Sequence, residues 1–137
     1  MVVEELAARD EADAIELWAS AGLTRAWNDA PTDFRRALEG PTSTVLGVKI
    51  DGTLVGTTMV GHDGHRGWIY YLAVDSRCRD EGIGSMLMSA AEEWLKLLGV
   101  VKVQLMVRSE NERVLNFFDK VGYEVSDVQV LSRWLNE

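Results

Sequence analysis

Apolar residues gather in three β-rich runs near the middle of the chain. Residues 44–50 (TVLGVKI) and 53–60 (TLVGTTMV) flank Asp51-Gly52, and residues 68–74 read WIYYLAV. An Asp-Gly pair between two such runs predicts a tight hairpin, because both central residues of a type I′ turn need a positive φ. The three runs therefore predict an antiparallel meander.

The spacing of apolar positions then changes to that of a helix. From Ile83 onward they recur every three or four residues, and Gly99 follows as a helix end. Residues 100–107 (VVKVQLMV) read as a strand and 111–121 as a helix, and the tail YEVSDVQVLSRWL alternates well enough for one or two last strands. A strand–helix–strand order predicts a parallel strand pair with a right-handed crossover.

The N-terminal part predicts one short strand and two helices. Residues 2–7 (VVEELA) suit a strand, Asp10 suits the N-cap of the first helix, and a second helix is expected between Thr32 and Gly40. No repeat, linker or low-complexity segment interrupts the pattern. The sequence therefore predicts a single mixed α/β domain over residues 1–137.

Composition and charge narrow the classes of function. Asp and Glu number 22 against 14 Lys and Arg, which gives a net charge of -8. That charge argues against general nucleic-acid binding, which depends on phosphate neutralisation. It favours a cationic second substrate such as an amine, unless it serves solubility alone. One cysteine, an acidic N-terminus and the lack of a long apolar run suit a cytoplasmic protein without a membrane span or secretory signal.

Residues 77–87 (RCRDEGIGSML) lie where the third β-rich run gives way to the helix. The first turn of a helix offers unpaired N–H groups and the positive end of the helix dipole to an anion. Gly82 and Gly84 leave room for close approach, Ser85 adds a hydroxyl, and the two arginines add charge. The loop is therefore a candidate phosphate site.

Two acidic residues in this loop, Asp80 and Glu81, would repel a phosphate that they faced. At a helix start, however, carboxylates are stabilised by the dipole and can point to solvent, which is the orientation we expect. A plain strand-to-helix turn with capping charges is the alternative, because short glycine motifs also arise by chance.

The same stretch resembles a family signature. Residues 79–84 (RDEGIG) match R/Q-x-x-G-x-G/A, the acetyl-CoA signature of the GNAT superfamily of N-acetyltransferases. The strand YYLAV precedes it, and residues 111–123 (NERVLNFFDKVGY) resemble the family's N-x-x-A-x-x-[LF]-Y-x-x-x-G-[FY] segment. WND at 27–29 and GHDGHRG at 61–67 are similar to a bacterial YpeA-like subgroup.

This resemblance implies a GNAT-like α/β fold. Such a fold has a mixed, mostly antiparallel twisted sheet of six or seven strands with about four helices, splayed between the fourth and fifth strands. A bulge in the fourth strand opens the gap, and the pantetheine arm of acetyl-CoA pairs with the strand backbone there. The implied cofactor-binding residues are Leu72, Ala73, Val74, Arg77, Arg79, Asp80, Glu81, Gly82, Ile83, Gly84, Ser85, Asn111 and Phe118.

The implied chemistry is direct transfer of the acetyl group to a neutral amine. A backbone N–H near Val74 would stabilise the oxyanion, and one of Tyr70 and Tyr71, which alternate across the strand, would face the cleft. The family's leaving-group acid is a tyrosine, but Phe118 stands at that position and cannot donate a proton. Tyr123 is an alternative acid, although core packing suits it as well.

Two further polar segments have open interpretations. Trp27, Asn28 and Asp29 lie in the segment that covers the acceptor side in this family; they suit amine binding, with Trp27 as a cation–π wall, or simply a helix connection. The HDGH turn at 62–65 lacks a third and fourth ligand at a familiar spacing, so no metal is expected.

The leading interpretation is an acetyl-CoA-dependent N-acetyltransferase acting on a primary amine of a small molecule or a protein, with no nucleic-acid or membrane partner. Tryptophans at periodic positions suit a core or an interface, which leaves a homodimer open. Because Phe118 replaces the acid, a CoA-binding regulatory module with little or no catalysis is the rival. A third reading is an interaction protein with a purely structural loop that binds no CoA.

Overall fold

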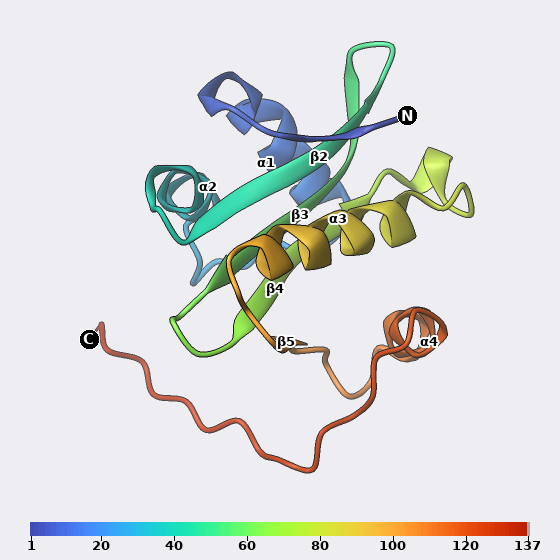
Figure 1. The fold of residues 1–137 in the computed structure, drawn as a ribbon. Helices are drawn as coiled ribbons and strands as arrows, with labels where there is room; N and C mark the ends of the chain where they lie inside the picture. Colours follow the sequence, from blue (N-terminus) through green and yellow to red (C-terminus); the bar gives the residue numbers. More distant parts are fainter. Residues whose placement is uncertain (137) are drawn as a thin grey trace. The chain divides into compact units, whose positions relative to one another are not determined.

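A five-stranded sheet with helices on both faces forms most of the computed structural model, which describes residues 1–136 (Figure 1). Its strands are β1 (Val3–Glu5), β2 (Ser43–Ile50), β3 (Thr53–His62), β4 (Gly67–Val74) and β5 (Val103–Leu105). Its helices are α1 (Glu11–Ser20), α2 (Ala30–Glu39), α3 (Ile83–Leu97) and α4 (Glu112–Lys120), with short 3-10 helices η1 (Ala8–Asp10) and η2 (Ser76–Cys78). The chain divides into two units: Met1–Met106 holds the whole sheet, and the other, which begins at Val107, holds α4.

The strands lie side by side in the order β1-β2-β3-β4-β5. Neighbours are antiparallel, except that β4 and β5 are parallel and are connected through α3. The predicted meander and the predicted parallel pair are therefore confirmed, as is a mixed, mostly antiparallel sheet. The expected six or seven strands are wrong, because residues 1–136 form a sheet of five.

The missing strands were predicted in the C-terminal tail. Residues 124–136 form no helix or strand, and several of their apolar side chains are exposed, among them Val125, Leu131 and Leu135. Alternation gives a segment two different faces, but a strand exists only where its N–H and C=O groups pair with a neighbouring strand. The tail therefore alternates in its sequence but forms no strand, because its backbone pairs with no neighbouring strand.

The Asp-Gly hairpin forms as predicted. β2 and β3 are joined by Asp51, with φ 50°, and Gly52, with φ 80°, and both values are positive as a type I′ turn requires. Ile50 pairs with Thr53 directly across the turn. The turn therefore fixes the register of this strand pair from its closed end.

The near face of the sheet in Figure 1 carries α3, which crosses it in front of β3 and β4. Gly56 and Gly67 make this close packing possible. A Cβ on Gly56 would lie 2.7 Å from Ile83 Cγ2, and a Cβ on Gly67 would lie 2.6 Å from Leu95 Cδ1. The absence of these two side chains therefore sets how closely α3 approaches the sheet.

The opposite face carries α1 and α2. Trp18 of α1 and Phe34 of α2 are completely buried, with ring centroids 6.0 Å apart. They belong to one apolar cluster that also contains Leu6, Val45 and Ala73. This cluster, which we call the α1–α2 core, includes Ala73 near the end of β4, so it lies beside the segment expected to bind the cofactor.

Candidate functional site

The strand β4 loses its β5 neighbour part-way along its length. The parallel ladder runs from the Gly67–Val103 pair to the Ile69–Leu105 pair and stops there, although β4 continues. Among residues 1–136, no strand pairs with residues 70–74 on that side. Their backbone groups are therefore open to a ligand that carries amide groups of its own.

A β-bulge lies within this open part of β4. Tyr70 pairs with Met59 and Ala73 pairs with Thr57, so β4 advances three residues while β3 advances two. Tyr71, inside the bulge, has φ 52°, a left-handed value that is rare for an aromatic residue. The splay and the bulge both occur where the family resemblance implied them.

The bulge reverses the direction of the backbone groups that follow it. N–H groups alternate between the two sides of a strand. At Gly67 the N–H points to the β5 side and donates to Lys102 O at 2.8 Å. At Asp75 it points the other way and donates to Val55 O of β3 at 2.8 Å. Both residues have odd numbers, so in a regular strand their N–H groups would point to the same side. The extra residue of the bulge has shifted the alternation by one position. The N–H of Val74, next to Asp75, therefore points away from β3 into the open gap.

Tyr71 is fixed by contacts with α1 and α2. Its hydroxyl donates to Asp33 Oδ2 at 2.8 Å, and its ring stacks on Trp18 with centroids 3.9 Å apart and an interplanar angle of 11°. Burial raises the pKa of Tyr71, and the hydrogen bond and charge of Asp33 raise it further. The hydroxyl therefore stays protonated and is committed to Asp33.

Tyr70 and Tyr71 lie on the same face of the sheet, so the expectation that they alternate is wrong. Met59 packs against the α1–α2 core. Tyr70 is the partner of Met59 in the register, and directly paired residues share a face. Because the bulge absorbs one step, Tyr71 reaches Trp18 on this face too.

The N-terminus of α3 follows the loop and is open. Gly82 is the N-cap with φ 79°, no side chain caps the helix there, and a Cβ on Gly82 would meet no atom within 4 Å. In the described part of the chain, the N–H groups of Ile83, Gly84 and Ser85 donate to no protein acceptor. Free donors beside open space at a helix N-terminus fit an anion such as a diphosphate.

The acidic residues of the loop take the orientation expected from the sequence. Asp80 and Glu81 are exposed, as is Arg79. Asp80 has φ 67°, so two residues of this short loop, Asp80 and Gly82, adopt left-handed backbone conformations. The carboxylates thus lie in solvent near the positive end of α3, where the helix dipole stabilises them.

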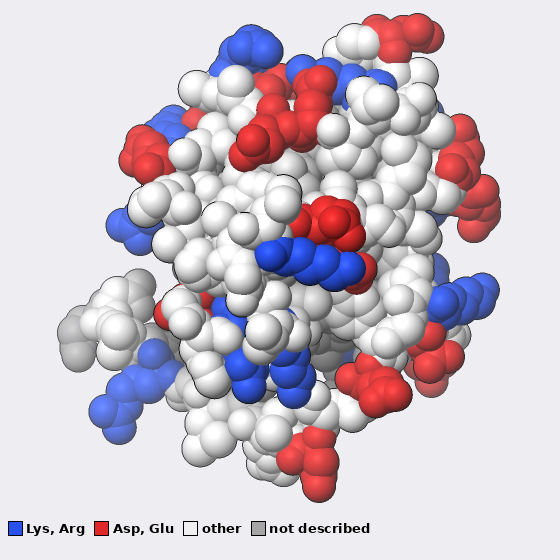
Figure 2. All heavy atoms as spheres, viewed as in Figure 1, with Lys and Arg blue, Asp and Glu red and all other residues white. Residues whose placement is uncertain are grey.

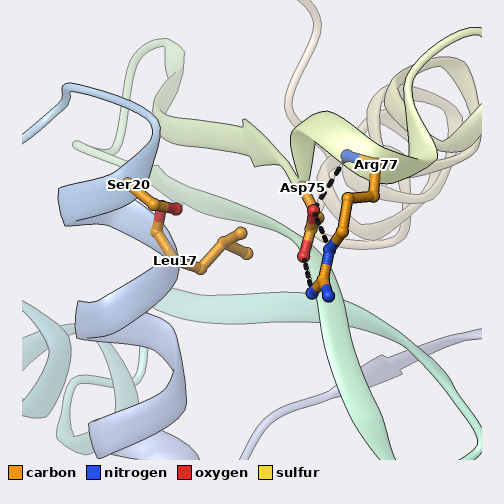
Figure 3. A network of polar contacts seen from close by, with 4 residues as sticks. All are labelled: Leu17, Ser20, Asp75 and Arg77. Carbon is orange, nitrogen blue, oxygen red and sulfur yellow. Dashed lines mark hydrogen bonds and ion pairs between the residues drawn. The ribbon is translucent and has the colours of Figure 1, made fainter.

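Arg77 is tied to Asp75 inside the loop (Figure 3). The guanidinium donates to Asp75 Oδ1 at 3.1 Å and to Oδ2 at 2.8 Å, and the backbone N–H of Arg77 donates to Oδ1 at 2.9 Å. Figure 3 shows the pair across from Leu17 and Ser20 of α1. The positive charge of Arg77, which was expected to bind a phosphate, is therefore partly neutralised by Asp75.

Arg77 lowers the pKa of Asp75 to about 2, first through its side-chain hydrogen bonds and then through its backbone N–H. We expect Arg77→Gln to move this pKa back toward the ordinary 3.8, but not fully, because the backbone N–H remains. A carbon-13 NMR titration of the carboxyl group measures it. The stability contributed by the pair is present above about pH 4 and is lost as the pH falls through the lowered pKa.

Asp63 provides the internal control for this titration. Its pKa is also about 2, but backbone N–H groups of Arg66 and His65 and the indole of Trp68 lower it. It should titrate unchanged in the Arg77→Gln protein. A variant in which Asp75 also titrates as in the original chain would contradict the ion pair.

Comparison with known proteins adds independent support to this geometry. The sequence matches the Acetyltransferase (GNAT) family over residues 7–123, which is most of the chain. The chain belongs to the GNAT acetyltransferase family. Members of this family take the acetyl group from acetyl-CoA.

Solved structures share the GNAT fold with this chain. Aminoglycoside antibiotic 6'-N-acetyltransferase AAC(6')-IG from Acinetobacter haemolyticus is 16% identical with a TM-score of 0.81, covering 99% of this chain and 100% of that one. Ribosomal-protein-alanine N-acetyltransferase from Brucella melitensis biovar Abortus 2308 is 18% identical with a TM-score of 0.77, covering 98% and 100%. AAC(6')-Iy, bound to a bisubstrate analog of CoA and acetylneamine, is 13% identical with a TM-score of 0.84, covering 96% of each chain.

The segment expected to bind the acceptor in this GNAT acetyltransferase precedes α2. Asp29 is the N-cap of α2, and its Oδ1 accepts the N–H of Thr32 at 3.1 Å, a bond that lowers the pKa of Asp29. Asn28 is exposed, and Trp27 is 56% exposed. Asp29 therefore has a structural task, while the indole of Trp27 is accessible to a ligand.

The HDGH segment forms the turn between β3 and β4. Asp63 Oδ1 accepts the N–H groups of His65 and Arg66 at 2.9 and 2.7 Å, and Oδ2 accepts the indole N–H of Trp68 at 3.1 Å. His62 Nδ1 accepts the N–H of Gly64 at 3.1 Å. Within residues 1–136 no three His, Cys, Asp or Glu side chains gather closely enough to hold a metal ion.

The second unit of this GNAT acetyltransferase carries Asn111, Phe118 and Tyr123. Asn111 is the N-cap of α4, and its Oδ1 accepts the N–H of Val114 at 3.3 Å. Phe118 is buried and meets Tyr123 edge to face, with centroids 5.5 Å apart. A phenyl ring with no proton to donate thus lies at the position that the family resemblance assigns to the acid.

Charge is dispersed over the surface of the chain. On the face drawn in Figure 2, Asp and Glu side chains are interspersed with Lys and Arg, and the basic groups do not merge into one broad field.

Across residues 1–136, no helix has both the length and the apolar character needed to cross a bilayer.

Sequence reasoning missed three residues at this site. Thr57, Asp33 and Trp18 contact the bulge residue Tyr71 or each other, although Trp18 was expected only in a core or interface. They come from β3, α2 and α1, far apart in the sequence. The register between β3 and β4 and the packing of α1 and α2 on the sheet bring them together, and no local sequence pattern indicates either.

Proposed function

We propose that this enzyme transfers the acetyl group of acetyl-CoA directly to a primary amine of a small molecule or a protein in the cytoplasm. The observation that carries the proposal is a pair of free backbone donor groups, the Val74 N–H beside the gap and the N–H groups of Ile83, Gly84 and Ser85 in the first turn of α3. Together these two groups of donors fit an amide-containing arm that ends in a diphosphate.

Each group of donors has a stated task in this proposal. Leu72, Ala73 and Val74 supply backbone groups to the arm, and the N–H groups after Gly82 hold the diphosphate. The N–H of Val74 lies on the side of the gap, so it is the candidate donor to the thioester oxygen as negative charge develops there. Asn111 and Phe118, on the second unit, are the remaining proposed contacts to the cofactor.

The transfer needs a neutral amine and a route for one proton. The amine nitrogen bonds to the acetyl carbon as the carbon–sulfur bond breaks, the nitrogen loses a proton, and the sulfur leaves as thiolate or gains a proton. Phe118 cannot supply that proton, so either the sulfur leaves as thiolate or Tyr123 serves as the acid. Tyr71 does not fit that task well, because its hydroxyl is committed to Asp33.

The acceptor side is proposed to include Trp27, Asn28 and Asp29. The accessible indole of Trp27 suits a cation–π contact with an ammonium group before deprotonation. Two structurally similar enzymes are named for amine acceptors, an aminoglycoside and the alanine of a ribosomal protein. The WND and GHDGHRG segments favour a YpeA-like subgroup within the family.

A product assay tests the proposal. The protein is incubated with acetyl-CoA and a panel of polyamines, aminoglycosides and peptides with free N-termini, and free thiol and acetylated product are followed together. We expect thiol release that depends on the amine and equals the acetylated product. No binding of acetyl-CoA in a titration calorimeter would overturn the proposal.

The rival function is a CoA-binding regulatory module. The replacement of the family's tyrosine by Phe118 motivates it. It predicts binding of CoA without thiol release on any amine across the panel. The same assay therefore separates the two, since both predict binding but only the enzyme turns over.

A further inference from the structure

The strained bulge in β4 needs something to hold it. Tyr71 has φ 52°, and Asp51, Tyr71 and Asp80 are the residues other than glycine with positive φ in the described chain. Asp51 and Asp80 lie in turns, whereas Tyr71 lies inside a strand. A left-handed aromatic residue in a strand is disfavoured and persists only where its surroundings fix it.

A closed set of contacts fixes this residue at three points. Trp18 Nε1 donates to Thr57 Oγ1 at 2.8 Å, and Thr57 Oγ1 donates to the carbonyl of Tyr71 at 3.0 Å. The ring of Tyr71 stacks on Trp18, and its hydroxyl donates to Asp33 Oδ2 at 2.8 Å. The carbonyl, the ring and the hydroxyl of the bulge residue are therefore all held.

The hydroxyl of Thr57 has one possible arrangement in this set. An indole N–H can only donate and a carbonyl can only accept, so the hydroxyl must accept from Trp18 and donate to Tyr71. Trp18 and Thr57 are fully buried, so water cannot replace either bond. The carbonyl that the bulge removes from the β-ladder thus gains its partner from Thr57.

We propose that Trp18, Thr57 and Asp33 are positioning residues that hold the Tyr71 bulge and thereby aim the N–H of Val74 at the thioester. The inference rests on the proposed function, because it assigns a task to the same gap beside β4. Its physical basis is the shift in alternation, since the N–H of Val74 points into the gap only while the extra residue is accommodated.

Thr58 offers a matched control next to Thr57. Both side chains are fully buried, but Thr58 Oγ1 has no hydrogen-bond partner. Replacement of either threonine by valine keeps the shape and removes one buried hydroxyl. The Thr57→Val change breaks the set at the bulge, whereas Thr58→Val removes a group that contacts no polar partner.

The test compares two ligands. Acetyl-CoA uses the gap and the loop, whereas ADP carries a diphosphate without the thioester arm. We expect Thr57→Val to weaken acetyl-CoA binding and to lower kcat, each by about tenfold, with the affinity for ADP unchanged. Thr58→Val should change none of these quantities, and Thr57→Ser, which restores the hydroxyl, should recover the original values.

A second variant and two contrary results complete the test of the positioning role. If Thr57→Val is poorly folded, Tyr71→Phe removes only the hydroxyl bonded to Asp33 and should lower kcat about threefold without affecting ADP. Suppose that the original chain binds both ligands, but Thr57→Val either behaves like Thr58→Val or loses affinity for both ligands equally. The positioning role of Thr57 is then overturned, while the proposed function stands. If the original chain binds neither ligand, the proposed function fails and the inference fails with it.

Discussion

Replacing Gly82 by valine should weaken acetyl-CoA binding by about a hundredfold or more while the protein stays folded. Gly82 is the N-cap of α3 with φ 79°, and open space surrounds the position of a Cβ. Valine therefore meets no clash within the protein, but a β-branched residue strongly disfavours the left-handed conformation. The loop would change its path, and the new side chain would stand where the phosphate approaches the helix donors.

Gly99 provides a matched control at the other end of the same helix. It has φ 81° and also meets no atom within 4 Å of a Cβ position. Gly99→Val imposes the same backbone strain about 25 Å from Gly82, since a helix rises about 1.5 Å per residue. We expect titration calorimetry to show unchanged affinity for Gly99→Val. Equal affinities for Gly82→Val and the original chain would remove the loop from the cofactor site.

Local features of the fold could be predicted because their causes are local. The hairpin at Asp51-Gly52 depends on two adjacent residues that tolerate positive φ, and both have it. The helix after Gly82 depends on apolar spacing within one segment. In each case the residues that cause the structure are neighbours in the chain, so the sequence shows the cause directly.

The β4 bulge could not be predicted from residue pattern alone. WIYYLAV reads as an uninterrupted strand, and regular alternation placed Tyr70 and Tyr71 on opposite faces. A bulge is a mismatch between two strands, so it exists only in the register of β4 against β3. Its position came from the family resemblance.

The C-terminal tail shows the opposite error. Its alternation was real, but pairing requires a second strand that alternation does not specify, and residues 124–136 form no strand. At the site, the same limit hid Asp33 and Thr57, whose tasks depend on contacts with Tyr71. A sequence pattern predicts whether a residue lies in a helix or a strand. The contacts of Asp33 and Thr57 with Tyr71 depend instead on residues far away in the sequence.

Adding one methyl group at Gly56 should destabilise the protein by about 2 kcal/mol. A Cβ there would lie 2.7 Å from Ile83 Cγ2 and 3.0 Å from Leu87 Cδ1, and both of these side chains are buried. Because Ile83 is the first residue of α3 and its side chain is buried, we expect relief of the clash to move the helix start away from β3. Gly56→Ala should therefore lower the free energy of unfolding, measured in urea, and also weaken acetyl-CoA binding.

A loss of stability from Gly→Ala at Gly56 would be opposite to the usual effect of this change. Gly→Ala at a position with an ordinary φ normally stabilises a protein by about 0.4–1 kcal/mol, because it restricts the unfolded chain. Gly40 is such a position, with φ -77° and nearest contacts at 3.4 Å, so Gly40→Ala should be neutral or stabilising. A Gly56→Ala protein as stable as Gly40→Ala would show that α3 can shift without cost, and the close packing of its first turn on β3 would then have no part in placing the phosphate donors.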